Sequence, residues 1–243
     1  MVLRVNGFII PDESVLRKRI GQLKMNRAEV NFGNVYDTAI KFDTLLVRNE
    51  SGHEMELEFD KSVLPANLSL SMSESLIKPG ETSTILTSVS GDKEGKYGFN
   101  QYRVNFIDKA YPDSTKGQLI ITFSQLEDFG SWKNEDKSKA PRIDFFNKTC
   151  DFGSKLQGEK GECEFRFENK GKSALKIRDI RLPSHVSILR YDEVVEVNGT
   201  GVILLDVDTS RITGTLLRYV NVTTNCPTAT TVRLTIEGEV IEK

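Results

Sequence analysis

The stretch GECEFRFEN, residues 161–169, alternates apolar and charged side chains. Cys163, Phe165 and Phe167 fall on one side of the alternation, and the charged residues between them fall on the other. A period of two residues is typical of a β-strand with one buried and one solvent-facing side. We therefore expect a strand here whose cysteine and phenylalanine side chains enter a hydrophobic core.

The segments around this strand occur twice, in the same order and about 120 positions apart. The matching pairs are Phe32-Gly33 with Phe152-Gly153, Asn49 with Asn169, LPANLSL (64–70) with LPSHVSI (182–188), and Pro79-Gly80 with Asn198-Gly199. Because four landmarks keep their order and nearly their spacing, the chain contains two copies of one domain. The copies should superpose strand for strand. Leu45 and Val47 should then be core residues of the first copy, as Phe165 and Phe167 are of the second.

Each copy contains short β-rich runs separated by turn residues, which favours an all-β fold of two tandem immunoglobulin-like antiparallel β-sandwiches. The two Leu-Pro pairs should stand at the start of a strand, where proline is tolerated. The residues that follow should alternate, with Leu68 and Leu70 buried in one copy and Val186 and Ile188 buried in the other. Only SVLRKRIGQLK (14–24) suggests a helical turn.

Composition divides the chain into sandwiches over residues 25–130 and 138–243, with a polar linker over 131–137. Residues 1–24 then form a strand and linker. LRVNGFI (3–9) resembles LTIEGEV (234–240), the last strand of the second copy. We interpret Val2–Ile10 as the end of a truncated upstream repeat, or alternatively as a strand of the first sandwich. In either case it should pair with a sheet edge and end at Pro11, because an unpaired strand leaves backbone groups unsatisfied.

Charge and hydropathy exclude some functions. The net charge of −2 and the pI of about 5.9 argue against nucleic acid as a partner. The chain has no apolar run long enough to cross a bilayer, and its first residues do not resemble a signal peptide. The three cysteines, Cys150, Cys163 and Cys226, cannot form a complete disulfide framework and lack CxxC spacing. We therefore expect Cys163 to be a buried thiol.

Residues that carry chemistry are sparse. The only histidines, His53 and His185, lie in expected turns, and the second copy's His185 stands where the first copy has Asn67. Asp206 and Asp208 share one strand face, which could be imagined as an acid pair but is better interpreted as a solvated strand end. Asn49 and Asn198 are interpreted as turn residues. We expect no catalytic, cofactor-binding or metal-binding residues, no cofactor, and no enzymatic activity.

The second copy has a frame of turn residues and apolar positions at Phe152-Gly153, Phe167, Asn169, Gly171, Asn198-Gly199, Gly214 and Gly238. This frame resembles a bacterial family of unknown function, common in Bacteroidetes, whose domains are related to Hydin-type (ASH) domains and to major sperm protein. The resemblance implies immunoglobulin-type sandwiches, export to the periplasm or cell surface, and no known chemistry. The Cys-Gly-Cys cluster of many such domains is absent here.

Two functions are consistent with these patterns. The first is a non-catalytic extracytoplasmic binding or scaffold protein that acts through protein–protein interaction, its partner and oligomeric state being unknown. The alternative is a glycan-active enzyme or its accessory binding module, and a pilus-chaperone-like pair is a weaker third. We expect a periplasmic, cell-surface or secreted location, with the cytoplasm as the alternative. Any export signal or membrane anchor would lie in a missing N-terminal segment.

Overall fold

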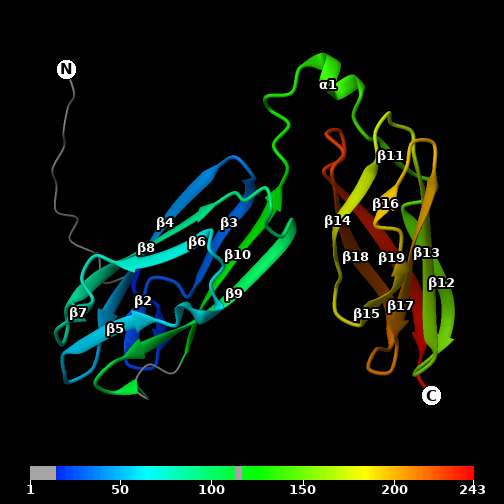
Figure 1. The fold of residues 1–243 in the computed structure, drawn as a ribbon. Coiled ribbons are helices and arrows are strands. Elements are labelled where there is room, and N and C mark those ends of the chain that lie inside the picture. Colours follow the sequence, from blue (N-terminus) through cyan, green and yellow to red (C-terminus); the bar gives the residue numbers. More distant parts are fainter. Residues whose placement is uncertain (1–14, 113–116) are drawn as a thin grey trace. The chain divides into compact units, whose positions relative to one another are not determined.

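The computed structural model describes residues 15–112 and 117–243 (Figure 1). The expected strand Val2–Ile10 and its end at Pro11 lie outside the described residues. The chain forms two compact units that divide near residues 124 and 125. Each unit is a sandwich of two β-sheets around its own hydrophobic core, which confirms the expected all-β, immunoglobulin-like class.

The first sandwich consists of two five-stranded sheets, in the orders β1-β2-β4-β8-β6 and β3-β10-β9-β5-β7. Its strands are β1 (Lys18–Ile20), β2 (Leu23–Met25), β3 (Glu29–Tyr36), β4 (Ile40–Asn49), β5 (Met55–Phe59), β6 (Leu68–Met72), β7 (Leu76–Ile77), β8 (Thr82–Ser90), β9 (Gly98–Asp108) and β10 (Gln118–Leu126). A short 3-10 turn, Lys61–Val63, precedes β6.

The second sandwich has a four-stranded sheet, β11-β13-β17-β15, and a five-stranded sheet, β12-β19-β18-β14-β16. Its strands are β11 (Ile143–Phe145), β12 (Thr149–Leu156), β13 (Lys160–Asn169), β14 (Leu175–Arg181), β15 (Val186–Tyr191), β16 (Val194–Val195), β17 (Thr200–Asp208), β18 (Gly214–Thr224) and β19 (Thr231–Ile241). The helix α1 (Asn134–Ser138) precedes it.

The two sandwiches repeat the same topology. Apart from β1, each strand of the first has a counterpart at the same place in the sheet order of the second, so that β4 corresponds to β13 and β6 to β15. This confirms the expected repeat. Most pairings are antiparallel, but β12 runs parallel to β19. That pairing departs from the purely antiparallel arrangement that we expected.

The core positions follow the alternation in the sequence. Leu45, Val47 and Phe167 have no exposed surface, and Phe165 is almost completely buried. A side chain at Gly201 would collide with Phe167, since a Cβ there would lie 2.5 Å from the ring atom Cζ. The small residue opposite Phe167 in β17 therefore makes room for the ring. These four core predictions are confirmed.

The Leu-Pro pairs lie just before β6 and β15, in turns and not in helices. After the first pair, Leu68 and Leu70 are buried, as predicted. After the second, Val186 is only partly buried against the core, and the prediction that Ile188 is buried is wrong, because 36% of it is exposed. The pairing of β15 with β17 shifts register between Ile188 and Arg190, and such a bulge re-aims the side chains of an edge strand.

The helical turn expected in SVLRKRIGQLK is absent from the described part of that stretch. Residues 18–25 instead form a β-hairpin of β1 and β2, with Gly21 at positive φ between the strands. The hairpin pairs with β4, and Leu23 is completely buried. The apolar side chains of this stretch therefore enter the first core from strands, so part of the expected linker is sheet.

The prediction that Cys163 is a free thiol is wrong. Its sulfur is bonded to that of Cys150, which lies 13 positions earlier on the neighbouring strand β12. Cys163 is nevertheless completely buried, as its place in the alternation requires. Cys226 is the remaining free cysteine, and it is buried as well. The odd count of cysteines therefore reflects one internal disulfide and one core thiol.

Candidate functional site

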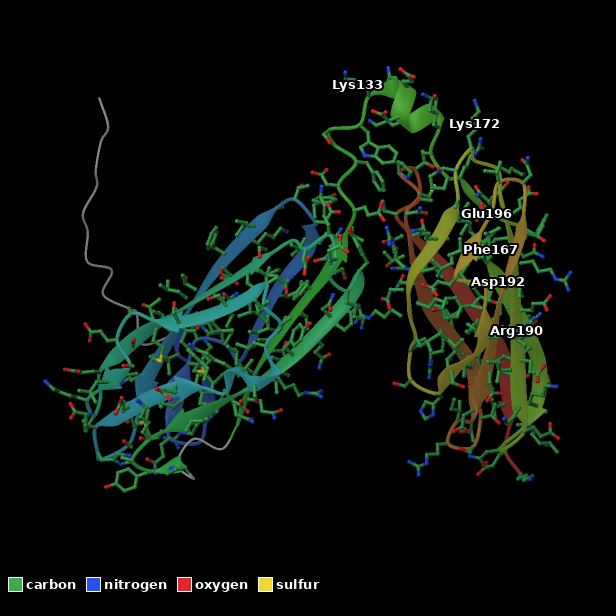
Figure 2. All side chains as sticks on the ribbon, viewed as in Figure 1. Lys133, Phe167, Lys172, Arg190, Asp192 and Glu196 are labelled. Atoms are coloured by element: carbon green, nitrogen blue, oxygen red, sulfur yellow. A yellow bond between two sulfur atoms is a disulfide. The ribbon has the colours of Figure 1, made fainter. Side chains whose placement is uncertain are left out.

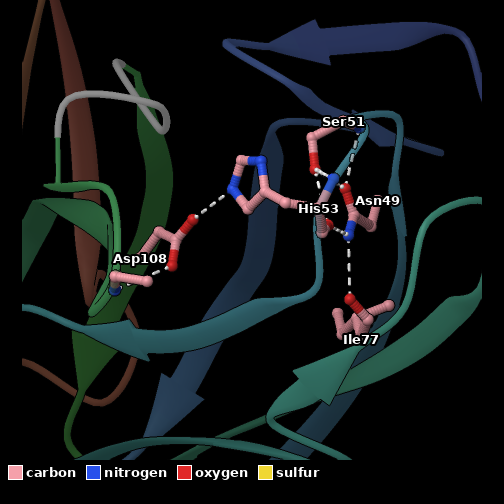
Figure 3. Close-up of polar contacts among 6 residues, drawn as sticks. Asn49, Ser51, His53, Ile77 and Asp108 are labelled. Atoms are coloured by element: carbon pink, nitrogen blue, oxygen red, sulfur yellow. Dashed lines mark hydrogen bonds and ion pairs between the residues drawn. The ribbon is translucent and has the colours of Figure 1, made fainter.

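Asn49 and Asn169 organise the same turn in the two sandwiches, and Figure 3 shows the bonds of Asn49. Asn49 Nδ2 donates to the backbone oxygens of His53 and Ile77, at 2.7 and 2.8 Å, and its Oδ1 accepts from Ser51. Asn169 makes the corresponding bonds to Ser173 and Val195. Both asparagines are buried, so their amides satisfy backbone groups that water does not reach. Asn49 is the last residue of β4, so it organises the turn through its side chain instead of lying within it, whereas Asn198 lies in a turn with a positive φ of 59°, as predicted.

The most suggestive polar pair of the first sandwich is His53 with Asp108 (Figure 3). The Nε2 atom of His53 lies 3.1 Å from Oδ2 of Asp108, whose side chain is fully buried, and the imidazole packs on Tyr111. A histidine oriented by a buried aspartate is part of many hydrolytic sites. Here, however, the nearby hydroxyl of Ser51 donates to the backbone oxygen of His53 and to Asn49, not to the imidazole. The pair therefore holds a turn against the end of β9.

His185, Asp206 and Asp208 come together in the second sandwich, where they line a shallow groove of about 480 Å³ with Lys160. Asp206 is mostly buried and lies 3.6 Å from Lys160 Nζ. Hydrogen bonds from Ser210 lower the pKa of the Asp208 carboxyl, and the nearby His185 acts in the same direction. Asp206 thus lies beside a lysine, and Asp208 caps a turn. The two carboxyls differ in environment but do not form an acid and a base around a shared substrate position.

The described residues offer few other groups that could carry out chemistry. Within residues 15–112 and 117–243, no group of three or more His, Cys, Asp and Glu side chains is placed to hold a metal ion. No helix in the described part of the chain is long and apolar enough to cross a membrane. An exposed edge strand offers another kind of candidate, a surface on which a partner protein can dock.

The edge strand β15 is such a surface. It is the outermost strand of its sheet and pairs on one side with β17. Three of its apolar side chains are exposed, Ile188 by 36%, Leu189 by 48% and Tyr191 by 41%. Val194 and Val197, in the segment that follows, are also exposed. We call the strand together with these side chains the β15 edge.

The equivalent edge of the first sandwich is different. Strand β6 occupies the same place in its sheet, but Leu68 and Leu70 are buried, and the alternate residues Ser69 and Ser71 face solvent. The β6 edge is therefore polar on its exposed side, as edge strands of soluble proteins usually are. The fold does not require an apolar edge, so the exposed side chains of β15 need another explanation.

Charged side chains flank the β15 edge on the outer face of the same sheet. Arg190 and Asp192, which Figure 2 labels, line a groove of about 390 Å³ together with Glu164, Arg166 and Phe146. Arg166 is paired with Glu164 at 2.5 Å. Asp192 accepts a hydrogen bond from the backbone of Val202, which ties the end of β15 to β17. Charged side chains of both signs therefore lie beside the apolar strip, and one of the charge pairs is an ion pair.

These features define a pair of immunoglobulin-like sandwiches with an apolar edge strand. Residues 143–240 match the model of a family described as a protein of unknown function (DUF1573). This match confirms the family resemblance seen in the second copy. No curated protein matches the chain.

Solved structures share the fold. A protein of unknown function from Porphyromonas gingivalis W83 aligns over 90% of this chain and 100% of its own, with a TM-score of 0.68 and 15% identity. An ASH/PapD-like domain of human CEP192 aligns over 43% of this chain and 89% of its own, with a TM-score of 0.38 and 15% identity. WR4, a C. elegans MSP family member, aligns over 43% of this chain and 98% of its own, with a TM-score of 0.30 and 10% identity. The first likeness supports the two-sandwich fold alone.

Sequence reasoning missed the β15 edge because it assigned the strand by analogy with β6. The signal was present in VSILRY, where Ile188 and Leu189 are adjacent and cannot both point into one core. It also missed the disulfide, since Cys150 and Cys163 are not in a recognised spacing motif. The two cysteines lie on the consecutive strands β12 and β13, in opposite sheets of one sandwich, where a bond between the sheets can form.

Proposed function

We propose that this protein is a non-catalytic binding or scaffold protein that acts outside the cytoplasm. Its partner is a protein that docks an extended segment along the β15 edge. The observation that carries the proposal is the exposure of Ile188, Leu189 and Tyr191 on a strand whose counterpart in the first sandwich keeps its apolar residues buried.

The backbone of β15 supports strand addition. An outermost strand presents N–H and C=O groups along its free side, and a partner strand can pair with them as another member of the sheet. Main-chain hydrogen bonds would supply affinity, and the side chains at alternate positions would supply specificity. The partner segment therefore needs an extended conformation and no proline at its paired positions.

The side chains define the chemistry of that segment. Leu189 and Tyr191 are both exposed on this strand, and a partner segment that pairs with it would cover them with its own apolar side chains. The neighbouring charged side chains lie at the border of the strip, where exposed charges contribute more to specificity than to affinity. We infer an extended segment with alternating apolar residues as the ligand.

The disulfide supports the proposed location. Disulfides persist in oxidising compartments such as the periplasm and the cell surface, and they are rare in the cytosol. The bond between Cys150 and Cys163 is therefore in keeping with an exported protein. The groove lined by Asp206 and Asp208 is the feature that bears on the glycan-active alternative, and there Asp206 lies 3.6 Å from Lys160 Nζ while Asp208 accepts a hydrogen bond from the backbone of Ser210.

A peptide selection tests the proposed function. A displayed library of random octapeptides is selected against the purified chain, and the affinities of the recovered peptides are measured by calorimetry. The edge variant carries Ile188→Lys and Leu189→Lys, since lysine on an edge strand opposes strand addition. The matched control carries Ser69→Lys and Ser71→Lys on the exposed side of β6.

We expect peptides with alternating apolar residues that lose at least about tenfold in affinity for the edge variant and keep their affinity for the β6 control. Peptides that bind both variants as tightly as the wild type would exclude β15 as the docking edge. A selection that yields no binder would count against a peptide-binding function altogether.

A further inference from the structure

The second sandwich contains a further pocket, apart from the two grooves described above. It is remote in sequence from β15 and is not needed for the proposed function. It has a volume of about 510 Å³ and is formed by the segment 137–142, the turn after β13 and the turn between β18 and β19. Its lining residues are Phe129, Lys137, Ser138, Ala140, Pro141, Arg142, Lys170, Gly171, Lys172, Pro227 and Thr228. No acidic residue is among them.

The backbone around the pocket is tightly packed. The amide of Lys170 donates to the oxygen of Arg142 at 2.8 Å, and the amide of Lys172 donates to the oxygen of Ala140 at 3.1 Å. Gly171 lies between them, where a Cβ would come within 2.5 Å of the Ala140 oxygen. Ala140 and Pro141 are buried, so these short segments fix the positions from which the cationic side chains extend.

Three of the four cations around the pocket lack a carboxylate partner. Among the described residues, no acidic side chain is ion-paired with Lys137, Arg142 or Lys172. Lys170, in contrast, lies 2.6 Å from Asp144 and 2.5 Å from Glu168. Figure 2 places Lys172 at the end of the second sandwich nearest α1. The pocket is thus lined by four cations and no acidic residue, beside an apolar surface of Phe129 and two prolines.

The first sandwich shows that the fold does not need these charges. Its amide of Glu50 donates to the oxygen of Gln22 at 2.9 Å, which is the counterpart of the bond between Lys170 and Arg142. Gln22 and Gly52 therefore stand where the second sandwich has Arg142 and Lys172. The same turn forms with neutral residues at both places, so the cations of the second copy serve something other than folding.

We propose that this pocket binds a small organic dianion, either a phosphate monoester or a dicarboxylate. Arg142, Lys172 and Lys137 contact the two negative charges, and an apolar or ring portion packs on Phe129, Pro141 and Pro227. Arg suits this role because its planar guanidinium donates two parallel hydrogen bonds to phosphate or carboxylate oxygens. The volume is within the range of small-molecule sites, which are about 300–1,000 Å³.

Amide NMR of the full chain tests the proposal near neutral pH with two probes, phenyl phosphate and phthalate. Inorganic phosphate, which lacks an apolar portion, is measured for comparison. The pocket variant carries Arg142→Gln and Lys172→Gly, which are the residues of the first sandwich at these positions, so folding should be retained. The charge-matched control carries Lys93→Gly and Arg211→Gln, two exposed turn positions outside the pocket.

We expect at least one probe to shift the amides of residues 137–142 and 170–172, and the tighter of the two identifies the class of dianion. The pocket variant should bind it at least about tenfold more weakly, because charge-assisted hydrogen bonds are lost, while the control stays within about twofold of the wild type. Equal weakening in both variants would overturn the proposal by revealing general charge screening. So would an absence of shifts at the pocket, or inorganic phosphate binding as tightly as phenyl phosphate.

Discussion

Glu50 and Lys170 occupy the same position in the two sandwiches and carry opposite charges. Each follows the buried asparagine that ends its strand, and each is paired with a residue of opposite sign two positions earlier. Glu50 Oε1 lies 3.4 Å from Arg48 Nε, and Lys170 Nζ lies 2.5 Å from Glu168 Oε1. The repeat has therefore kept an ion pair at this turn while inverting its polarity, and in the second sandwich the cation of the pair lies on the pocket side of the turn.

Lys170 has a measurable effect on the pKa of a neighbouring carboxyl. The side chain of Lys170 lowers the pKa of the Asp144 carboxyl below its ordinary value of 3.8, and Arg142 contributes a smaller effect in the same direction. Replacing Lys170→Gln should therefore raise the pKa of Asp144 toward 3.8, and Arg142→Gln should raise it less. Carbon-detected NMR titration of the carboxyl measures both changes.

The sign of the pH dependence follows. Because the folded-state pKa of Asp144 is depressed, its contribution to stability is present above pH 3.8 and is lost as the pH falls through the folded value. Below that value the wild type and Lys170→Gln should lose any difference in stability that arises from this pair. A larger pKa shift from Arg142→Gln than from Lys170→Gln would contradict the assigned order of causes.

Asn169→Ala should destabilise the second sandwich. Its amide group bonds the backbone of Ser173, Val195 and Gly171, and its removal leaves buried carbonyl groups unsatisfied. We expect a loss of about 1–3 kcal/mol in the free energy of unfolding, measured with urea. The exposed Asn147→Ala is the control and should change the stability by less than about 0.5 kcal/mol. Equal losses in the two variants would remove the structural role assigned to the buried turn.

Phe167→Ala should cost about 3–5 kcal/mol, since it removes a fully buried ring and leaves a cavity opposite Gly201. Denaturant unfolding followed by circular dichroism measures this loss. A loss below about 1 kcal/mol would mean that the alternation of β13 is reversed and that the charged residues face the core.

The cysteines predict a defined labelling pattern. In denaturant without reductant, a thiol-alkylating reagent should modify Cys226 alone, and after reduction it should modify Cys150 and Cys163 as well. The double variant Cys150→Ala/Cys163→Ala should lose about 2–4 kcal/mol of stability, because the cross-link restricts the unfolded chain. Labelling of all three cysteines without reductant, in protein made in an oxidising compartment, would contradict the disulfide.

The repeat made most of the fold predictable. Alternation placed Phe165 and Phe167 in a core, and the spacing of Asn49 and Asn169 related the sandwiches. These features depend on local periodicity and on turn residues, which sequence records directly. The burial predicted for Ile188 by analogy with the first sandwich was wrong. A bulge in an edge strand depends on the pairing of β15 with β17 and not on the residue pattern of β15 alone.

The surface sites were less predictable than the cores. The pocket beside Lys172 joins three segments that are separated in sequence, and single basic residues on the surface carry no signal of their own. Likewise, the pairing of Cys150 with Cys163 depends on β12 and β13 lying in opposite sheets of one sandwich. Both features arise from tertiary contacts that a repeat of turn motifs does not encode.

We expect β15 to accept a partner strand, and amide hydrogen exchange of the full chain measures this directly. Exchange at residues 186–191 is compared with and without the tightest peptide from the selection. Strand addition should slow exchange at alternate amides of β15, the ones on its free side, and leave β6 unchanged. Slowing that falls on β6 or on the pocket beside Lys172, with β15 unaffected, would contradict the account.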